Sequence, residues 1–242
     1  MNFTEIFKDA LKYPSQNWKI VLILGVLLLI PELISTGGSL DSTQPFLPIF
    51  GGIIGIILGI FVSGYLVSDL KSTIESNDSL PEIDLSNNII DGLKYLVVNI
   101  VYAIIYVILL MVFGFLIVFS SEVSGILVAI FGIIALILVI AIALFALISY
   151  ARLADTGSIG EALNLKEVWE DINTIGIGNL ITWALLLILI GIAVFIILMV
   201  IFVLAAFIPY LLIVITFLIS LLVAPYFSLF TNRALGLLYA ER

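Results

Sequence analysis

Two sets of polar side chains recur at fixed distances in this 242-residue chain, and their types and spacing could support chemistry. Sliding the sequence by 82 residues, and then by a further 80, aligns three aspartates and three asparagines. A ring of carboxylates offers the oxygen ligands that a hard cation prefers. Amides that line a shared constriction could hydrogen-bond a polar solute. The recurring residues are Asp9, Asp91 and Asp171, and Asn17, Asn99 and Asn179.

Both sets also have a simpler interpretation, and the sequence leaves the two open. Each aspartate lies among other charged or polar residues on one face of an expected helix, which is typical of a solvated surface. Each asparagine lies where an expected helix enters the membrane, and an asparagine there can cap the unpaired N–H groups of the first turn.

Other chemistry has little support in the composition. The chain lacks cysteine and histidine, which removes disulfides, thiolates, imidazole ligands and the commonest general base. The sequence contains no P-loop, dinucleotide fingerprint or nucleophile–base pair. Glu32 and Glu122 fall near outer ends of expected spans, where we expect them to face loops and not a proton relay. We therefore predict a protein that is not an enzyme and that has no cofactor and no metal.

The overall composition indicates an integral membrane protein. Hydrophobic residues make up 63% of the chain and charged residues only 11%, and the mean hydropathy is +1.35. Soluble domains contain about 25% charged residues. A formal net charge of −8 also argues against nucleic acid as a partner. Pro31-Glu32 follows the first apolar run without a small-residue cleavage site, so we interpret that run as a retained transmembrane helix.

Hydropathy divides the chain into six expected transmembrane helices. The last 51-residue stretch without a charge must form two of them, because at about 1.5 Å per residue it exceeds twice a ~30 Å hydrocarbon core. Pro209 marks the turn between these two, and Pro225 is expected to kink the last helix. The approximate ranges are 18–34, 49–68, 95–119 and 125–150, with the final pair inside 180–230.

An amphipathic helix is expected before each pair of spans. In the third, apolar residues at i, i+3, i+4 and i+7 of 165–172 share one face, opposite a charged face. Such a helix lies in the membrane surface, and aligned anchors Phe7, Ile89 and Trp169 would point into it. The fold class we predict is all-α: one polytopic membrane domain, 1–242, built of three parallel pseudo-repeats. Each repeat is an interfacial amphipathic helix plus a transmembrane hairpin, over approximately 2–80, 84–160 and 164–242.

Small residues recur at intervals of four in the second span. They form a strip along which another helix backbone can approach closely, either within the chain or in a dimer. The strip consists of Gly51, Gly55, Gly59 and Ser63.

Basic residues predict the orientation. All nine lie on one side of the six-span arrangement, so the positive-inside rule places both termini and the three surface helices in the cytoplasm of a multi-pass cell-membrane protein. They are Lys8, Lys12, Lys19, Lys71, Lys94, Arg152, Lys166, Arg233 and Arg242.

Three short motifs at the repeat boundaries carry a resemblance to a known family. They are Leu11-Lys-Tyr-Pro14, Tyr150-Ala-Arg-Leu-Ala-Asp-Thr-Gly157 and Asn232-Arg-Ala-Leu-Gly236. With them the chain resembles, over nearly its whole length, an uncharacterised family of archaeal membrane proteins common in methanogens. It is more loosely similar to the membrane domain of some glycerophosphodiester phosphodiesterases. The resemblance implies an archaeal plasma membrane and supplies no functional residues.

The sequence leaves two possible functions open. The first is a non-catalytic scaffold or accessory subunit of a lipid- or envelope-associated membrane assembly, with lipids, other membrane proteins or a second copy as partners. The alternative is a facilitative channel or a lipid or small-molecule transporter, with a path along the pseudo-threefold axis. A continuous polar cavity would favour the alternative, and a centre filled by side chains would favour the scaffold.

Overall fold

The computed structural model describes residues 2–40, 46–121, 123–208 and 210–242, and within these ranges the chain is helical and contains no strand. Glu122 and Pro209, for which the sequence predicts outer turns, lie outside the described residues. The elements are α1 (Phe3–Lys12), η1 (Tyr13–Gln16), α2 (Trp18–Leu40), α3 (Leu47–Ile74), α4 (Leu85–Ser121), α5 (Gly125–Thr156), α6 (Ile159–Ala162), α7 (Leu165–Ile175), α8 (Ile177–Ala205), α9 (Leu211–Leu218), η2 (Ile219–Val223) and α10 (Ala224–Ala240).

Within the described residues, six helices are long and apolar enough to cross a membrane, as the hydropathy predicts. They are α2, α3, α4, α5, α8 and the continuous stretch from α9 to α10. Several continue beyond the predicted ends: α3 reaches Ile74 and α5 reaches Thr156. The helical turns beyond the predicted ends contain charged residues such as Lys71 and Arg152. These residues lie outside the apolar segments from which the spans were predicted.

The second predicted surface helix is not separate from the following span. Residues 85–121 form one helix of 37 residues, α4. The other two short helices end where the backbone is interrupted: Pro14 lies in the 3-10 turn that follows α1, and Gly176, at φ +89°, follows α7. No proline or positive-φ glycine stands between Leu85 and Tyr95, so nothing redirects the helix there.

The last span is interrupted where Pro225 predicts a kink. A π-helical segment, η2, separates α9 from α10. Pro225 has no N–H for the carbonyl of Leu221, and this carbonyl lies against Gly25 of α2, where a Cβ would overlap it. Beside it, the Ser220 hydroxyl donates to the Glu32 carboxylate. The expectation that Glu32 faces a loop is therefore wrong, because it lies within α2 and bonds to a neighbouring helix.

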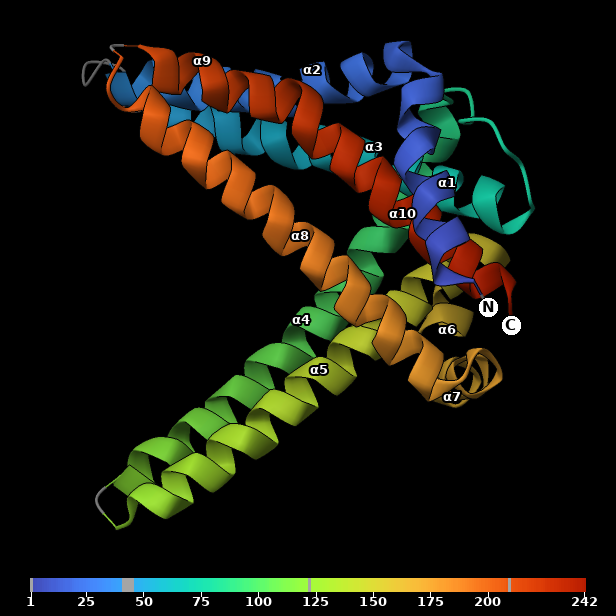
Figure 1. Ribbon diagram of the computed structural model, residues 1–242, viewed down its shortest axis with the longest axis vertical. Helices are drawn as coiled ribbons and strands as arrows, with labels where there is room; N and C mark the ends of the chain where they lie inside the picture. Colours follow the sequence, from blue (N-terminus) through green and yellow to red (C-terminus); the bar gives the residue numbers. More distant parts are fainter. Residues whose placement is uncertain (1, 41–45, 122, 209) are drawn as a thin grey trace.

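The long helices meet at one end of the molecule and diverge from it (Figure 1). The α4–α5 hairpin points away from α2, α3 and α9, and α8 runs between these groups. Both termini and the short helices α1, α6 and α7 lie at the end where the long helices meet. We call this end the junction and the diverging parts of the helices the arms.

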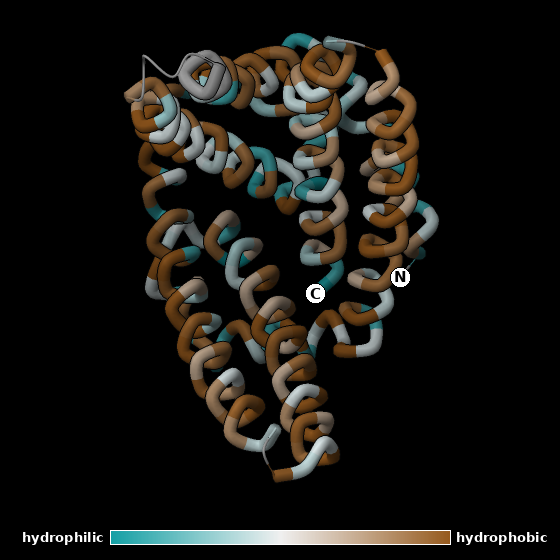
Figure 2. Tube along the Cα trace, turned by 90° about the vertical axis from the view of Figure 1, so that its left-hand side faces the viewer, coloured by the Kyte–Doolittle hydropathy of each residue, from teal (hydrophilic) through white to brown (hydrophobic). Residues whose placement is uncertain are grey.

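The core lies in the junction. Its largest fully buried side chains include Trp183, Tyr13, Tyr65 and Tyr239. By contrast, no residue is buried in the most apolar window of α5 or of α8. Figure 2 shows the α4–α5 arm, at the bottom, as predominantly hydrophobic along its length. The arms therefore expose to their surroundings the kind of surface that lipid covers.

Only part of the small-residue strip packs against another helix. Added Cβ atoms at Gly51 and Gly55 would meet Pro31 of α2, but one at Gly59 would meet nothing within 4 Å, so Gly59 makes no such contact within the chain, and the dimer alternative stays a prediction. Positions four apart advance by about 40° around a helix, which turns the strip away from α2. The closest approach of α3 to α4 instead involves Gly64, against the carbonyl of Asn88, and Gly92, against that of Ile60.

Candidate functional site

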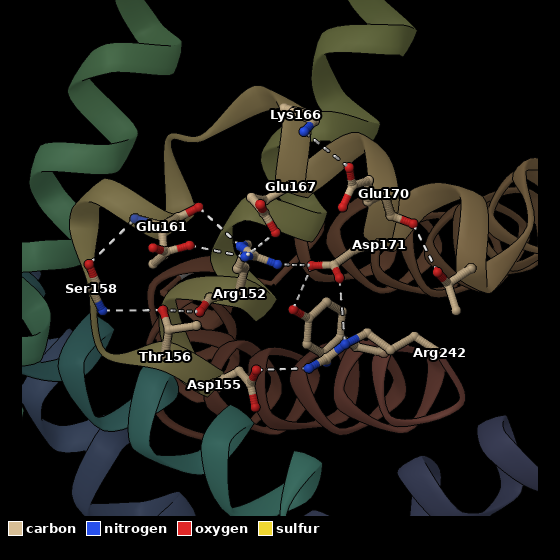
Figure 3. A network of polar contacts seen from close by, with 12 residues as sticks. Arg152, Asp155, Thr156, Ser158, Glu161, Lys166, Glu167, Glu170, Asp171 and Arg242 are labelled. Atoms are coloured by element: carbon tan, nitrogen blue, oxygen red, sulfur yellow. Dashed lines mark hydrogen bonds and ion pairs between the residues drawn. The ribbon is translucent and has the colours of Figure 1, made fainter.

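An arginine at the end of α5 organises the polar contacts around α6 and α7 (Figure 3). Its guanidinium forms ion pairs with three carboxylates, at 3.0 Å from Glu161, 2.9 Å from Glu167 and 2.9 Å from Asp171. The Arg152 side chain is only 12% exposed. Gly157, at φ +67°, ends α5 and lets the chain turn back, so that α6 and α7 bring their acids to Arg152.

Asp171 connects this cluster to the C-terminal helix. Besides Arg152, it accepts a hydrogen bond of 2.8 Å from the Tyr239 hydroxyl and lies 3.5 Å from Arg242 Nε. Arg242 also pairs with Asp155 at 2.8 Å and stacks over the Tyr239 ring, 3.9 Å from its centroid. We call these residues together the Arg152 network. It fastens α5, α7 and α10 to one another.

A second arginine, on α10, does the same for α1. Arg233 pairs with Asp9 at 2.7 Å and with Asp78 at 2.8 Å, and donates to the carbonyl of Asn77 at 2.6 Å. Its side chain is 3% exposed, whereas those of Asp9 and Asp78 are 47% and 89% exposed. The guanidinium also lies over the ring of Tyr13, 4.5 Å from its centroid. We call this set the Arg233 network.

Tyr13 joins the Arg233 network to a carboxylate inside the protein. Its hydroxyl donates to Asp69 of α3 at 2.8 Å, and Asn232 of α10 donates to the other Asp69 oxygen at 3.1 Å. Asp69 is completely buried. Burial raises the pKa of the Tyr13 phenol well above its usual value, and the neighbouring Asp69 carboxylate raises it further, so the phenol keeps its proton and donates.

Asn232 also lines a cavity of about 250 Å³ where the hairpins meet, which we call the junction cavity. Walls come from α3, α4, α5, α8 and α10, so all three expected hairpins contribute. Hydroxyl, amide and indole groups share the surface with leucines and a valine, and no charged side chain lines it. The lining residues are Ser63, Leu66, Val67, Leu70, Tyr95, Leu147, Tyr150, Trp183, Leu187, Ser228, Thr231, Asn232 and Leu235.

This lining suits a small amphipathic molecule better than an ion. Neutral hydroxyl and amide groups can hydrogen-bond a polar head, and the leucines can contact a chain. The walls are well fixed: Trp183 donates to the carbonyl of Ala234 at 3.2 Å, and the rings of Tyr95 and Tyr150 lie 4.7 Å apart. Among the described residues, no group of three or more acids is arranged to hold a metal ion.

Residues 47–204 match the family described as "Protein of unknown function (DUF4013)". The chain belongs to this family. The match runs from the start of α3 almost to the end of α8, so it includes the Arg152 network up to Asp171 and four of the five helices that line the junction cavity. No curated protein and no solved structure matches the chain. Membership of an uncharacterised membrane-protein family thus agrees with the resemblance seen in the sequence, and the family assigns no activity to the cavity.

The recurring asparagines do not meet in a constriction. Asn17, Asn99 and Asn179 are all exposed, and none lines the junction cavity. Instead, the Asn17 side chain accepts from the backbone N–H of Ile20 at 3.4 Å, and that of Asn179 donates to the carbonyl of Ile175 at 2.8 Å. The capping interpretation therefore describes Asn17, and Asn179 bonds locally across the turn between α7 and α8.

The recurring aspartates do not form a ring. Asp9 pairs with Arg233, Asp91 pairs with Lys94 at 2.9 Å, and Asp171 belongs to the Arg152 network. Each carboxylate is thus opposed by a basic group of its own, and a cation-binding ring is wrong for this structure.

The three aligned anchors have different surroundings. Phe7 is half-buried and packs against the core, with its ring 6.3 Å from Trp183 and 6.2 Å from Phe230. Trp169 is 44% exposed and stacks on Phe145 at 5.9 Å, and Ile89 is 47% exposed on α4. Phe7 therefore contacts the core through α8 and α10, in contrast to the exposed Trp169 and Ile89.

Several junction residues were not predicted as site residues, although the sequence contained a signal for them. Tyr13, Tyr150, Arg152, Asn232 and Arg233 all lie in the three motifs that carry the family resemblance. Asp69 lies outside these motifs, but it follows Tyr65 at the end of the second span much as Asp155 follows Tyr150 at the end of the fourth. The motifs at the repeat boundaries were thus the better guide to the junction than the recurring aspartates and asparagines.

Proposed function

We propose that this protein is a non-catalytic scaffold or accessory subunit of a lipid- or envelope-associated assembly in the cell membrane. The observation that carries the proposal is the contrast between the packed junction and the arms that diverge from it (Figure 1). Two ion-pair networks hold the helices together at one end, and apolar faces remain exposed along the arms. Such faces suit lipids, the helices of other membrane proteins, or a second copy of the chain.

The contacts in the junction support a build of three parallel repeats. Asp9 on the first short helix meets Arg233, at the exit of the third hairpin, and Asp171 on the third meets Arg152, at the exit of the second. The start of α4 meets the exit of the first hairpin through Ser68, which donates to Asn88 at 3.2 Å. Each unit thus contacts the hairpin that precedes it in a cyclic order, which is the pattern expected of a pseudo-threefold arrangement.

The proposed orientation has both termini in the cytoplasm. The support is that the basic residues lie on the side of α1, α7 and the termini, away from the turns that join the helices of each hairpin. Single cysteines replacing Ser121 and Thr43 should react with an impermeant maleimide only from outside, and Asn77→Cys only from inside. Reaction of Asn77→Cys from outside would reverse the orientation.

A second candidate function is a facilitative channel or a lipid or small-molecule transporter. The observation that favours it is the junction cavity, to which all three hairpins contribute lining residues. Its mixed lining suits an amphipathic solute. In that case the junction would bind the cargo and the arms would form its route into the bilayer.

Native purification followed by mass spectrometry of bound proteins and lipids tests both functions. For the scaffold, a defined protein partner or a second copy should co-purify, and bulky substitutions on the exposed arm faces, Ile108→Trp and Ile137→Trp, should release it. Ser63→Leu, which fills the junction cavity, should not. Loss of a bound small molecule from Ser63→Leu alone would favour the transporter, and a chain that carries neither protein nor second copy would contradict the scaffold.

A further inference from the structure

An apolar groove separate from the junction cavity runs along α8 beside the start of α2. Its volume is about 290 Å³, and it shares no lining residue with the junction cavity. We call it the Trp18 groove. Leu11, Trp18 and Tyr226 lie at one end, and Ile190 and Val194 of α8 line its continuation.

The end at Trp18 is well defined. Tyr226 donates its hydroxyl proton to the carbonyl of Leu11 at 2.5 Å, which ties α10 to the end of α1. The rings of Trp18 and Tyr226 lie 5.9 Å apart, and Trp18 is 50% exposed. Tryptophan and tyrosine are enriched at the level of lipid headgroups, because their rings are apolar and their tips are polar. This end of the groove therefore has the character of a membrane interface.

Three lysines on α1 and at the start of α2, the elements that contribute Leu11 and Trp18, differ from the other basic residues of the chain. Six of the nine have a carboxylate within 4.0 Å: Lys71, Lys94, Arg152, Lys166, Arg233 and Arg242. Within the described ranges, no carboxylate lies that close to Lys8, Lys12 or Lys19, and all three are exposed. Of the two acids on α1, Asp9 is engaged by Arg233, which leaves Glu5.

We infer that the Trp18 groove binds an anionic phospholipid of the surrounding bilayer. Lys12 follows Leu11 and Lys19 follows Trp18, so two ammonium groups are next in the chain to residues that line one end of the groove. Neither lysine lines the groove itself, and Lys19 borders the neighbouring depression formed with Leu22 and Val26. The two ammonium groups would neutralise the phosphate and the headgroup charge, while an acyl chain lies against Ile190 and Val194. In a chain of net charge −8, a local group of lysines that lack acidic neighbours favours an anionic ligand over a neutral one. Because the groove is apolar and lies along a membrane-spanning helix, its occupant enters from the bilayer.

Native mass spectrometry of the full chain, released from nanodiscs of phosphatidylglycerol and phosphatidylcholine in equal amounts, tests this inference. The wild-type chain should retain phosphatidylglycerol preferentially. In Lys12→Gln/Lys19→Gln, retention of phosphatidylglycerol relative to phosphatidylcholine should fall about 30-fold, since each lysine near the surface contributes roughly a factor of five. Val194→Trp, which fills the groove, should reduce the bound amount of both lipids.

Lys166→Gln is the matched control, because Lys166 is also an exposed lysine but lies on α7. It should retain phosphatidylglycerol as the wild type does. Melting curves recorded without added lipid should be the same for the wild type and the double variant, which would show that both are folded. Equal retention of the two lipids by the wild-type chain, or a loss in Lys166→Gln as large as in the double variant, would overturn the inference.

Discussion

The Arg152 and Arg233 networks fasten a short helix to the end of a hairpin in two different ways. In the Arg152 network both members of the central pair, Arg152 and Asp171, have side chains that are 12% exposed. In the Arg233 network only the arginine is buried, and its acidic partners, Asp9 and Asp78, remain largely in solvent. Asp171 is shared by Arg152, Arg242 and Tyr239, so its removal affects three groups at once in a nearly buried place, whereas Asp9 pairs with Arg233 alone, and Arg233 keeps Asp78 and the carbonyl of Asn77. Both networks pair an arginine at the end of a hairpin with an aspartate on a short helix, but the loss of that aspartate should lower the stability of the protein by different amounts.

The start of α4 also packs against the end of a hairpin, at α3, but the described residues form no ion pair there. Here Gly64 and Gly92 let the two backbones touch, and α4 continues without a break. A short helix that the chain reaches through a turn needs side-chain contacts to fix its direction. A segment that is already part of a long helix needs only a surface that fits.

The largest effect is expected from Gly64→Leu. The new side chain would overlap the backbone of Asn88, and because backbone cannot move aside, α3 and α4 would separate. We expect a loss of about 3 kcal/mol or more, measured as a lower melting temperature in detergent. Gly59→Leu is the control, since a Cβ at this position meets nothing within 4 Å. Leucine has the higher helix propensity, so propensity cannot cause a loss, and an equal loss in both variants would show that the contact with Asn88 is not what requires glycine at Gly64.

The comparison of the two networks is tested most directly by Asp171→Ala and Asp9→Ala. Asp171→Ala removes the acceptor shared by Arg152, Arg242 and Tyr239 and should cost about 3 kcal/mol. Asp9→Ala leaves Arg233 with Asp78 and should cost about 1 kcal/mol. Raising the salt concentration should reduce the effect of Asp9→Ala more, because exposed pairs are screened. Equal losses would remove the distinction between the networks.

Tyr13→Phe and Tyr239→Phe compare the tyrosine donors of the two regions. Tyr13→Phe leaves the completely buried Asp69 with Asn232 as its remaining side-chain donor, so we expect a loss of about 2 kcal/mol. Tyr239→Phe should cost about 1 kcal/mol, because Asp171 keeps its two arginines. Melting curves of the two variants give the difference, and a larger loss in Tyr239→Phe would contradict it.

The smallest effect is expected from Lys166→Ala. Lys166 lies 3.8 Å from Glu170 on the outer face of α7, and its side chain is 81% exposed. Solvated pairs of this type contribute little, so the melting temperature should not change measurably. Proteolysis of the segment between α5 and α8 should be unchanged in Lys166→Ala and accelerated in Asp171→Ala. Acceleration in both would mean that the outer face of α7 also holds the helix in place.

The properties that the sequence alone determined are those that depend on neighbouring residues. Six apolar stretches specify six long helices, because hydropathy and helix length are local. Pro14, Gly176 and Pro225 mark breaks for the same reason: each changes the backbone where it stands. The motifs at the repeat boundaries also pointed to the region that became the junction.

Only the tertiary structure decided which distant segments come into contact. Tyr13, Asp69 and Asn232 come from three parts of the chain, and only the packing of η1 and α10 on α3 brings them together. The direction of a helix face is equally undetermined by spacing, so Gly59 faces open space while Gly64 touches a backbone. Likewise, three aspartates at matching positions meet three different surroundings, from the exposed Asp9 to the nearly buried Asp171. Spacing along the chain places a residue on an element, but its surroundings depend on which other elements pack there.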